Sequence, residues 1–247
     1  MLCPKCNQPC SDKATECRHC GIIFSKYYRL MEERAERRAN ASEVKVIDTT
    51  GSRIREVKQL LFEVEDEVNP FVFWGRIVLF VIIVIYGAKF CLASIASNYA
   101  GQSFLHLVNL PFHEAGHVLF TPFPRLLTSL GGTLGQLLIP LICMFAMLLQ
   151  ARNPFGASIC FWWFGQNFFD IAPYINDARS LSLPLLGGNV GSRSPYGFHD
   201  WEYILGETGL LRYDHFLAGT AVAVGMMIFF LAYAWGAYLL FRQYQNL

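Results

Sequence analysis

The sequence predicts an all-α polytopic membrane protein with about four to five membrane helices and a small N-terminal zinc ribbon. Its 247 residues are 53% hydrophobic and only 16% charged, which is too apolar for an ordinary soluble domain. The charge is also unevenly placed, since 12 of the 20 Lys and Arg and 12 of the 19 Asp and Glu lie before residue 70. We therefore expect a ribbon over residues 1–24, a charged helical connector over 25–68 and a multi-pass membrane domain over 69–247.

Two cysteine pairs, "CPKC" and "CRHCG", stand in the first twenty-one residues and form a C-x2-C-x10-C-x2-C pattern. Each pair can make a tight knuckle that presents two thiolates to one tetrahedral ion, and four thiolates close the site. The pattern predicts a structural zinc held by Cys3, Cys6, Cys17 and Cys20. The alternatives are a disulfide-linked pair of loops, or Cys10 or His19 in place of one ligand. Because so short a segment has almost no core, metal binding should supply its folding energy.

The connector has two stretches with helical character, "SKYYRLMEERAERRA" and "RIREVKQLLFEVEDEV". Between them, "NASEVKVIDTTGS" breaks the pattern, so we expect an interruption there. The mixed charges predict a solvated helical face, with docking to a partner or to the membrane surface as the alternative.

The first membrane span is expected from Asn69, in "NPFVFWGRIVLFVIIVIYGAKFCLASIA". Further apolar segments cover about 103–123, 129–150, 154–177 and 213–241, the first of these being either a full span or a re-entrant helix. Twelve basic residues before the first span predict a cytosolic N terminus and, we expect, a place in the cell inner membrane. With a net charge of +1, nothing indicates a nucleic-acid partner.

The segment "NLPFHEAGHVLF" places two histidines and a glutamate inside an apolar run. On a helix, residues four apart share a face, so His113 and His117 can bind one zinc while Glu114 projects beside the open coordination position. Ionisable side chains at membrane depth are rare unless they are functional. The pattern thus predicts a catalytic zinc, and the alternative is a hydrogen-bonded polar cluster without metal.

A catalytic zinc normally has three protein ligands and one water, so a third ligand must come from elsewhere. Pro173, in "NFFDIAPYINDARS", is expected to distort or unwind its segment, which suits a stretch that carries a ligand. The residues alone leave several candidates in the apolar body: His106, Asp170, Asp177, His199, Asp200, Glu202, Glu207, Asp214 and His215.

At these motifs, over roughly residues 103–178, the chain resembles the site-2 protease family of intramembrane zinc metalloproteases. In that family the H-E-x-x-H helix is joined by an aspartate from a later N-x-x-P-x-x-x-x-D-G motif. The matching region here reads "DIAPYINDA", in which Pro173 and Asp177 align with the motif's proline and aspartate at a spacing one residue shorter. Asp170 stands in place of the asparagine and Ala178 in place of the glycine.

The resemblance implies a metallopeptidase whose catalytic zinc is bound by His113, His117 and Asp177, with Glu114 as the general base. Asp170 remains an alternative to Asp177. Together with the ribbon, two zinc ions are expected, one catalytic and one structural.

Two further features accompany these motifs. Gly131-x-x-x-Gly135 would let either another helix or a substrate backbone approach closely. The Gly- and Pro-rich segment "LSLPLLGGNVGSRSPYGFHDWEYIL" is expected to be a loop that forms a lid or a re-entrant element. Its "HDW", at His199 to Trp201, is either an interfacial anchor and helix cap or a contribution to the metal site.

The expected function is therefore zinc-dependent hydrolysis of peptide bonds in or near transmembrane segments of membrane proteins. The expected partners are the lipid bilayer, a membrane protein substrate and a cytosolic protein that binds the ribbon. A competing hypothesis is a catalytically inactive zinc-ribbon adaptor with a protease-like body. A transporter would show paired inverted hydropathy halves, which the sequence lacks.

Overall fold

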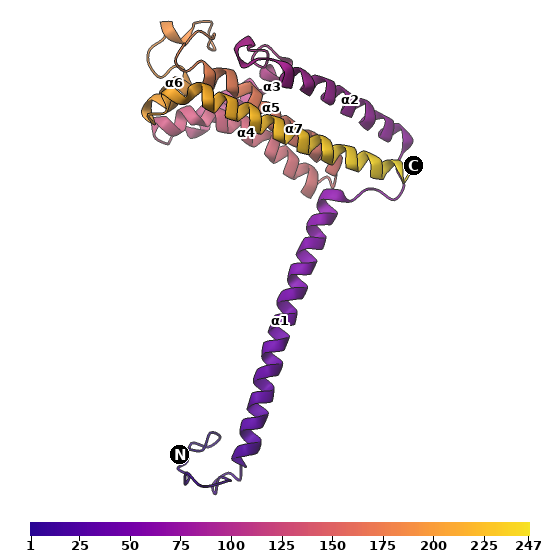
Figure 1. The fold of residues 1–247 in the computed structure, drawn as a ribbon, viewed down its shortest axis with the longest axis vertical. Helices are drawn as coiled ribbons and strands as arrows, with labels where there is room; N and C mark the ends of the chain where they lie inside the picture. Colours follow the sequence, from indigo (N-terminus) through magenta and orange to yellow (C-terminus); the bar gives the residue numbers. More distant parts are fainter. The chain divides into compact units, whose positions relative to one another are not determined.

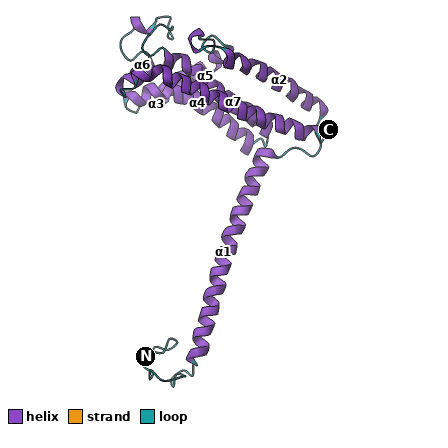
Figure 2. Cartoon of the chain, in the orientation of Figure 1, coloured by secondary structure: helices purple, strands orange, loops and turns teal.

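The computed structural model describes the backbone of residues 1–247 and the side chains of residues 1–38 and 51–247. The chain divides into two compact units, Met1–Gln59 and Leu60–Leu247. Its regular secondary structure is helical, as Figure 2 shows. Within the described residues, β-structure is limited to isolated bridges. The helices are α1 (Phe24–Phe62), α2 (Pro70–Leu92), η1 (Ile95–Ser97), α3 (Phe104–Phe120), α4 (Arg125–Leu149), α5 (Pro154–Asn176), η2 (Gly191–Arg193), α6 (Asp200–Glu207), η3 (Leu211–Tyr213) and α7 (Asp214–Tyr244).

The first unit begins with two similar cysteine loops. One is closed by a bridge between Leu2 and Pro9, and the other by a bridge between Glu16 and Ile23. The residue after the second cysteine of each pair has a positive φ, 56° at an asparagine in the first loop and 67° at Gly21 in the second. Glycine and asparagine are the residues that adopt this conformation most readily, so the sequence suits two knuckles of the same geometry.

α1 runs without a break through residues 40–52, where the sequence analysis expected an interruption. The helical prediction for the flanking stretches is confirmed, and the prediction of a break is wrong. A single glycine inside a helix lowers its stability by only about 1 kcal/mol relative to alanine. Because propagation adds one hydrogen bond for each residue fixed, two strong helical stretches can extend across such a segment.

The second unit is a helical bundle, which Figure 1 shows with its helix labels. α5 packs most extensively against α7, and α4 packs against both α3 and α5. α2 contacts α7, while the short α6 contacts α4. α5 is therefore the central helix, and its buried face carries polar side chains as well as apolar ones.

Aromatic side chains make up the largest apolar cluster of the bundle. The rings of Trp162 and Phe229 stack with centroids 5.0 Å apart, and Phe169 lies 4.9 Å from Phe229. Trp162 donates a hydrogen bond to the hydroxyl of Tyr233, which in turn donates to the carbonyl of Ile83. This chain of two hydrogen bonds links α5, α7 and α2, and it satisfies polar groups that burial would otherwise leave unpaired.

Three helical segments in the described part of the chain are long and apolar enough to cross a membrane: Pro70–Leu92, Arg125–Leu149 and Leu211–Tyr244. The chain thus has the character of a membrane protein, but the expected number of four to five spans is not confirmed. α3 has 17 residues, or about 25 Å of helix, against a hydrocarbon core of about 30 Å. α5 is long enough, but Gln166, Asn167 and Asp170 lower its hydropathy.

α5 continues through Pro173 and ends at Asn176, so the expected unwinding at this proline does not occur. The proline removes one backbone donor, but only three residues of helix follow it. The backbone N–H of Asp177 donates to the carbonyl of Pro173 at 2.9 Å, which closes the last turn. The proline removes only the hydrogen bond of its own missing N–H, and the bond after it is kept, so α5 reaches Asn176.

Candidate metal centres

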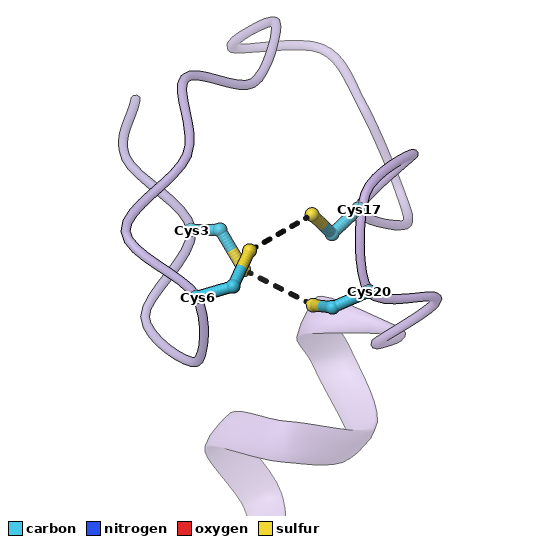
Figure 3. Close-up of side chains that lie close together, drawn as sticks. All are labelled: Cys3, Cys6, Cys17 and Cys20. Atoms are coloured by element: carbon cyan, nitrogen blue, oxygen red, sulfur yellow. Dashed lines mark hydrogen bonds between the residues drawn. The ribbon is translucent and has the colours of Figure 1, made fainter.

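The four predicted ribbon cysteines lie together, as Figure 3 shows. Sγ of Cys3 is 3.6 Å from that of Cys20, and Sγ of Cys6 is 3.7 Å from that of Cys17. Four sulfurs bound tetrahedrally at 2.3 Å from zinc lie about 3.8 Å apart, so this spacing suits one such ion. The group can hold a metal ion, as predicted from the spacing.

The electrostatics of the ribbon favour a cation. Burial acts to raise the pKa of Cys17, but the backbone N–H groups of Cys20 and His19 lower it to about 6. The N–H of Ile22 acts to lower the pKa of Cys20, but burial and the neighbouring sulfurs raise it to about 12. Because one thiolate opposes the ionisation of the next, a cation that attracts all four thiolates relieves this conflict.

Cys10 lies beside this group but is not one of its four members. Its thiol donates to the sulfur of Cys17 at 3.5 Å. Burial and the hydrogen bond to Cys17 raise the pKa of Cys10 to about 11. The geometry therefore favours the four predicted ligands over a set that includes Cys10.

His113 and His117 stand one helical turn apart on α3, with ring centroids separated by 4.8 Å. The carboxylate of Asp200, the first residue of α6, reaches both rings. Its Oδ2 lies 3.3 Å from Nε2 of His113 and 3.2 Å from Nε2 of His117. Three ligands at 2.0–2.1 Å from a tetrahedral zinc lie about 3.3–3.4 Å from one another, so these separations suit a shared ion.

The other nitrogen of each ring is held by an acceptor. Nδ1 of His113 lies 2.8 Å from Oε1 of Gln136, and Nδ1 of His117 lies 2.8 Å from the carbonyl oxygen of Thr128. Since both partners accept, each Nδ1 carries a proton and donates it. In the neutral form of each ring, Nε2 then has a lone pair, which is the tautomer that a metal ligand requires.

α4 lies close to α3 because glycines line their contact. A side chain at Gly131 or Gly135 would collide with the backbone of α3, and one at Gly116 would collide with that of α4. Of the two readings of Gly131-x-x-x-Gly135, close helix packing is the one that the structure shows. A Cβ atom at Gly132 would stand 2.5 Å from Nε2 of both ligating histidines, so only glycine leaves the space between them free.

A cavity of about 540 Å³ opens onto the two histidines and Asp200. Glu114 lines it, next to His113 in the sequence, as do Arg125 and Trp201. Much of its remaining wall comes from the Gly- and Pro-rich loop that the sequence analysis expected to act as a lid. The volume is typical of a pocket for a small molecule or a short peptide segment.

Asp170, an alternative third ligand, lies in a separate polar network. Its Oδ1 is 3.0 Å from Nδ1 of His106, and its Oδ2 accepts from Asn109 at 2.9 Å. Asn109 also donates to Gln166 and accepts from Trp163. His106 and Asp170 line the same cavity, but they are not part of the group around His113 and His117.

The structure corrects the expectation that Asp177 joins the two histidines. Asp177 directly follows α5 as its C-cap, and its carboxylate accepts from the backbone N–H of Ser182 at 3.0 Å and from that of Leu183 at 2.9 Å. Two serine hydroxyls also donate to this carboxylate, so it is held mainly by its own loop. The residue that joins the two histidines in a group able to hold a metal ion is Asp200.

From the sequence alone, Asp200 was only one of several candidates for the third ligand. The signal that could have distinguished it is its place directly after a long Gly- and Pro-rich loop and at the start of a short helix. His199 is the cap of that helix, as one reading of "HDW" expected, because its Nδ1 accepts from the backbone N–H of Glu202 at 3.1 Å. His199 itself does not belong to the metal group.

Comparisons of this chain with protein-family models, with curated proteins and with solved structures found no match.

Proposed function

We propose that the chain is an intramembrane zinc-dependent endopeptidase. The observation that supports this most directly is the convergence of His113, His117 and Asp200 on one point, with Glu114 lining the same cavity. Two neutral imidazoles and one carboxylate are a common donor set of catalytic zinc, in which a fourth position stays open to water. We propose both that this site binds zinc and that the zinc catalyses peptide hydrolysis.

The residues present fit such an ion on three independent grounds. The Asp200 oxygen lies at distances from the two Nε2 atoms that suit a tetrahedral site. The two Nδ1 atoms are committed to acceptors, which leaves Nε2 free to bind. Gly132 keeps the space between the rings clear, where any other residue would place a carbon atom.

When bound, zinc would lower the pKa of a water molecule and polarise the carbonyl of the peptide bond to be cleaved. The side chains of the protein supply the proton transfer and the positioning. Glu114 accepts the proton of the attacking water on its carboxylate and donates it to the nitrogen of the departing amine. The loop that lines the cavity limits access by bulk water, so the charges formed during the reaction lie in a partly enclosed site.

The proposed substrate is a transmembrane or membrane-adjacent segment of another protein. The histidines lie on α3, which packs against α4, one of the helices that can cross a membrane. A substrate helix must unwind locally to expose an amide, which favours segments with helix-breaking residues. With twelve basic residues before α2, we place the N terminus in the cytosol and the protein in the cell inner membrane.

The ribbon is proposed as a cytosolic docking module for a protein partner. Four thiolates around one ion leave no position for a substrate, so the ribbon does not take part in catalysis. The ribbon also belongs to a different compact unit from the histidine site.

The test is hydrolysis by the purified, detergent-solubilised full chain loaded with zinc. The probes are fluorescently labelled casein, which is unstructured, and a single-span reporter with a proline and a glycine in its helix. We expect the wild type to cleave both, and Glu114→Gln to retain zinc but to lose cleavage by at least about a hundredfold, because the amide cannot accept the proton.

Glu207→Gln, an exposed change on α6, is the matched control and should cleave at the wild-type rate. Undiminished cleavage by Glu114→Gln would exclude Glu114 as the base. If the zinc-loaded wild type cleaves neither probe, the inactive adaptor becomes the better account of the chain.

A further inference from the structure

The third ligand of the proposed site comes from a segment far from the helix that carries the first two. Asp200 follows the loop over residues 178–199, and α6, which begins with Asp200, has only eight residues. Ligand atoms must be held to within about 0.5 Å of their working positions. The rest of the structure must therefore fix the start of α6, and three observations show which groups do so.

The carboxylate of Asp177 organises the start of this loop. It is 3% exposed, and it accepts hydrogen bonds from the hydroxyls of Ser180 and Ser182 and from the backbone N–H groups of Ser182 and Leu183. A buried carboxylate with this many donors is satisfied as an anion. The bonds tie residues 180–183 to the end of α5.

His199 fixes the other end of the loop. Its side chain is 1% exposed, and its Nδ1 accepts the backbone N–H of Glu202 in the first turn of α6. A neutral ring that accepts through Nδ1 carries its proton on Nε2. Within the described residues this N–H makes no hydrogen bond, and Oδ2 of Asp177 lies 3.5 Å from Nε2.

We propose that Asp177 and His199 form a positioning pair that holds Asp200 against the two histidines. Asp177 fixes the loop and faces the ring of His199, the ring of His199 caps α6, and the cap sets the direction in which Asp200 points. Asp177 acts in this account through Asp200 and not as a ligand. The inference rests on the proposed metal site, because it concerns how that site is assembled.

The alternative is that Asp177 is only a loop anchor with no effect on the metal. The chain offers a matched control for that case. Asp214 is also a buried aspartate, at 0% exposed, and it pairs with Arg179 at 2.7 Å, two residues after Asp177. Asp214→Asn removes a buried carboxylate that holds the same loop through Arg179, whereas the group that faces His199 is Asp177.

The experiment measures zinc retention at the labile site of the purified full chain by competition with a chromophoric chelator. The ribbon zinc, which is held by four thiolates, serves as an internal reference in each variant. We expect Asp177→Asn to weaken retention at the histidine site by about 10- to 100-fold, the range found for outer-shell residues of metal sites. Asp214→Asn should leave it unchanged, and both variants should keep the ribbon zinc.

A double variant shows whether Asp177 acts through Asp200. If it does, Asp177→Asn should reduce retention no further when Asp200→Ala is already present. As a spectroscopic check, Co²⁺ exchanged into the labile site should give a weaker and shifted visible spectrum in Asp177→Asn, and a normal one in Asp214→Asn. Ser182→Ala, which removes one hydroxyl donor, gives a milder form of the same effect if Asp177→Asn fails to fold.

The outcomes separate two failures. If the wild type retains no zinc that depends on His113 and His117, the proposed function fails. If the wild type retains that zinc, three results overturn only the positioning role. In the first two, Asp177→Asn retains zinc as well as the wild type does, or loses no more zinc than Asp214→Asn. The third result is that Asp177→Asn lowers retention by its full factor even when Asp200→Ala is already present.

Discussion

The two candidate metal centres of this chain differ in how their ligands are brought together. In the ribbon, all four ligands fall within the first twenty residues, and two short loops place them. In the bundle, two ligands share a helix, but Asp200 is 87 positions after His113 and arrives on a different element. The first site depends on local chain geometry and the metal itself, whereas the second depends on the packing of α3, α4 and α6.

This difference leads to opposite expectations for the apoprotein. The ribbon lacks a core apart from its cysteines and a few apolar neighbours such as Phe24, so it should unfold when its metal is removed. The histidine site is built on packed helices, and Gln136 and Thr128 hold its two rings. Its geometry should therefore survive metal removal. The predictions below test this contrast, beginning with the largest expected effect.

The largest effect is expected at the ribbon. Cys17→Ser should abolish its zinc binding and unfold residues 1–24, since binding free energies of structural zinc sites are about 10–16 kcal/mol and supply the folding energy. The bundle should keep its helicity and its labile zinc. Metal analysis and limited proteolysis measure both results.

Cys10→Ser is the control for this change, because Cys10 contacts Cys17 but lies outside the group of four. It should keep the ribbon zinc and resist the protease. Equal loss of zinc in the two variants would mean that Cys10 is itself a ligand.

At the histidine site, Gly132→Ala should weaken zinc retention by about 100-fold. The added carbon would stand 2.5 Å from both Nε2 atoms, and rings held at Nδ1 have little freedom to move away. Chelator competition measures the effect. Gly219→Ala, where a side chain meets nothing within 4 Å, should leave retention unchanged. Normal retention in Gly132→Ala would show that the rings can rearrange, contrary to a site fixed by packing.

A smaller effect is expected from the acceptor behind His113. Gln136→Leu removes the partner of Nδ1 and should weaken retention by about 10-fold, at the low end of outer-shell effects. Gln136→Glu keeps an acceptor oxygen and should retain most of the affinity. Should both variants behave alike, the amide of Gln136 fills space and does not orient the ring.

The sequence predicted the local features of both sites and missed those that depend on distant contacts. Cys3, Cys6, Cys17 and Cys20 were predictable because their spacing determines the knuckles, and the placing of His113 and His117 on one face follows from helical periodicity. Asp200 was not predictable as a member of this group, because it reaches α3 at the end of a long loop. We propose that Asp177 and His199 determine the path of that loop. The motif match at Asp177 identified a residue beside the site but not its contacts.

The fold shows the same division. The helical segments were predictable from their apolar runs, yet α1 crosses the expected break and α5 crosses Pro173. In α1, the helical residues on either side outweigh the local helix-breaking signal. In α5, the proline removes only one hydrogen bond, so the helix continues. The polar side chains Gln166 and Asp170 of α5 are buried and hydrogen-bond to α3, which no local pattern reveals.

The smallest effect is expected from deletion of residues 1–24. If the ribbon is a docking module, the truncated chain should hold zinc at the histidine site and cleave labelled casein within about twofold of the wild-type rate. Cleavage of the natural membrane substrate in cells should fall. A truncated protein that is folded and zinc-loaded but inactive on casein would show that the ribbon contributes to catalysis.

The central claim is that His113, His117 and Asp200 bind one zinc, and anomalous X-ray diffraction at the zinc absorption edge tests it most directly. For the zinc-loaded full chain, we predict one peak among the four ribbon cysteines and a second within about 2.0–2.2 Å of Nε2 of each histidine and of a carboxylate oxygen of Asp200. A second peak bound by Asp177 in place of Asp200, or no peak at the histidines of a protein that retains its ribbon zinc, would contradict the account.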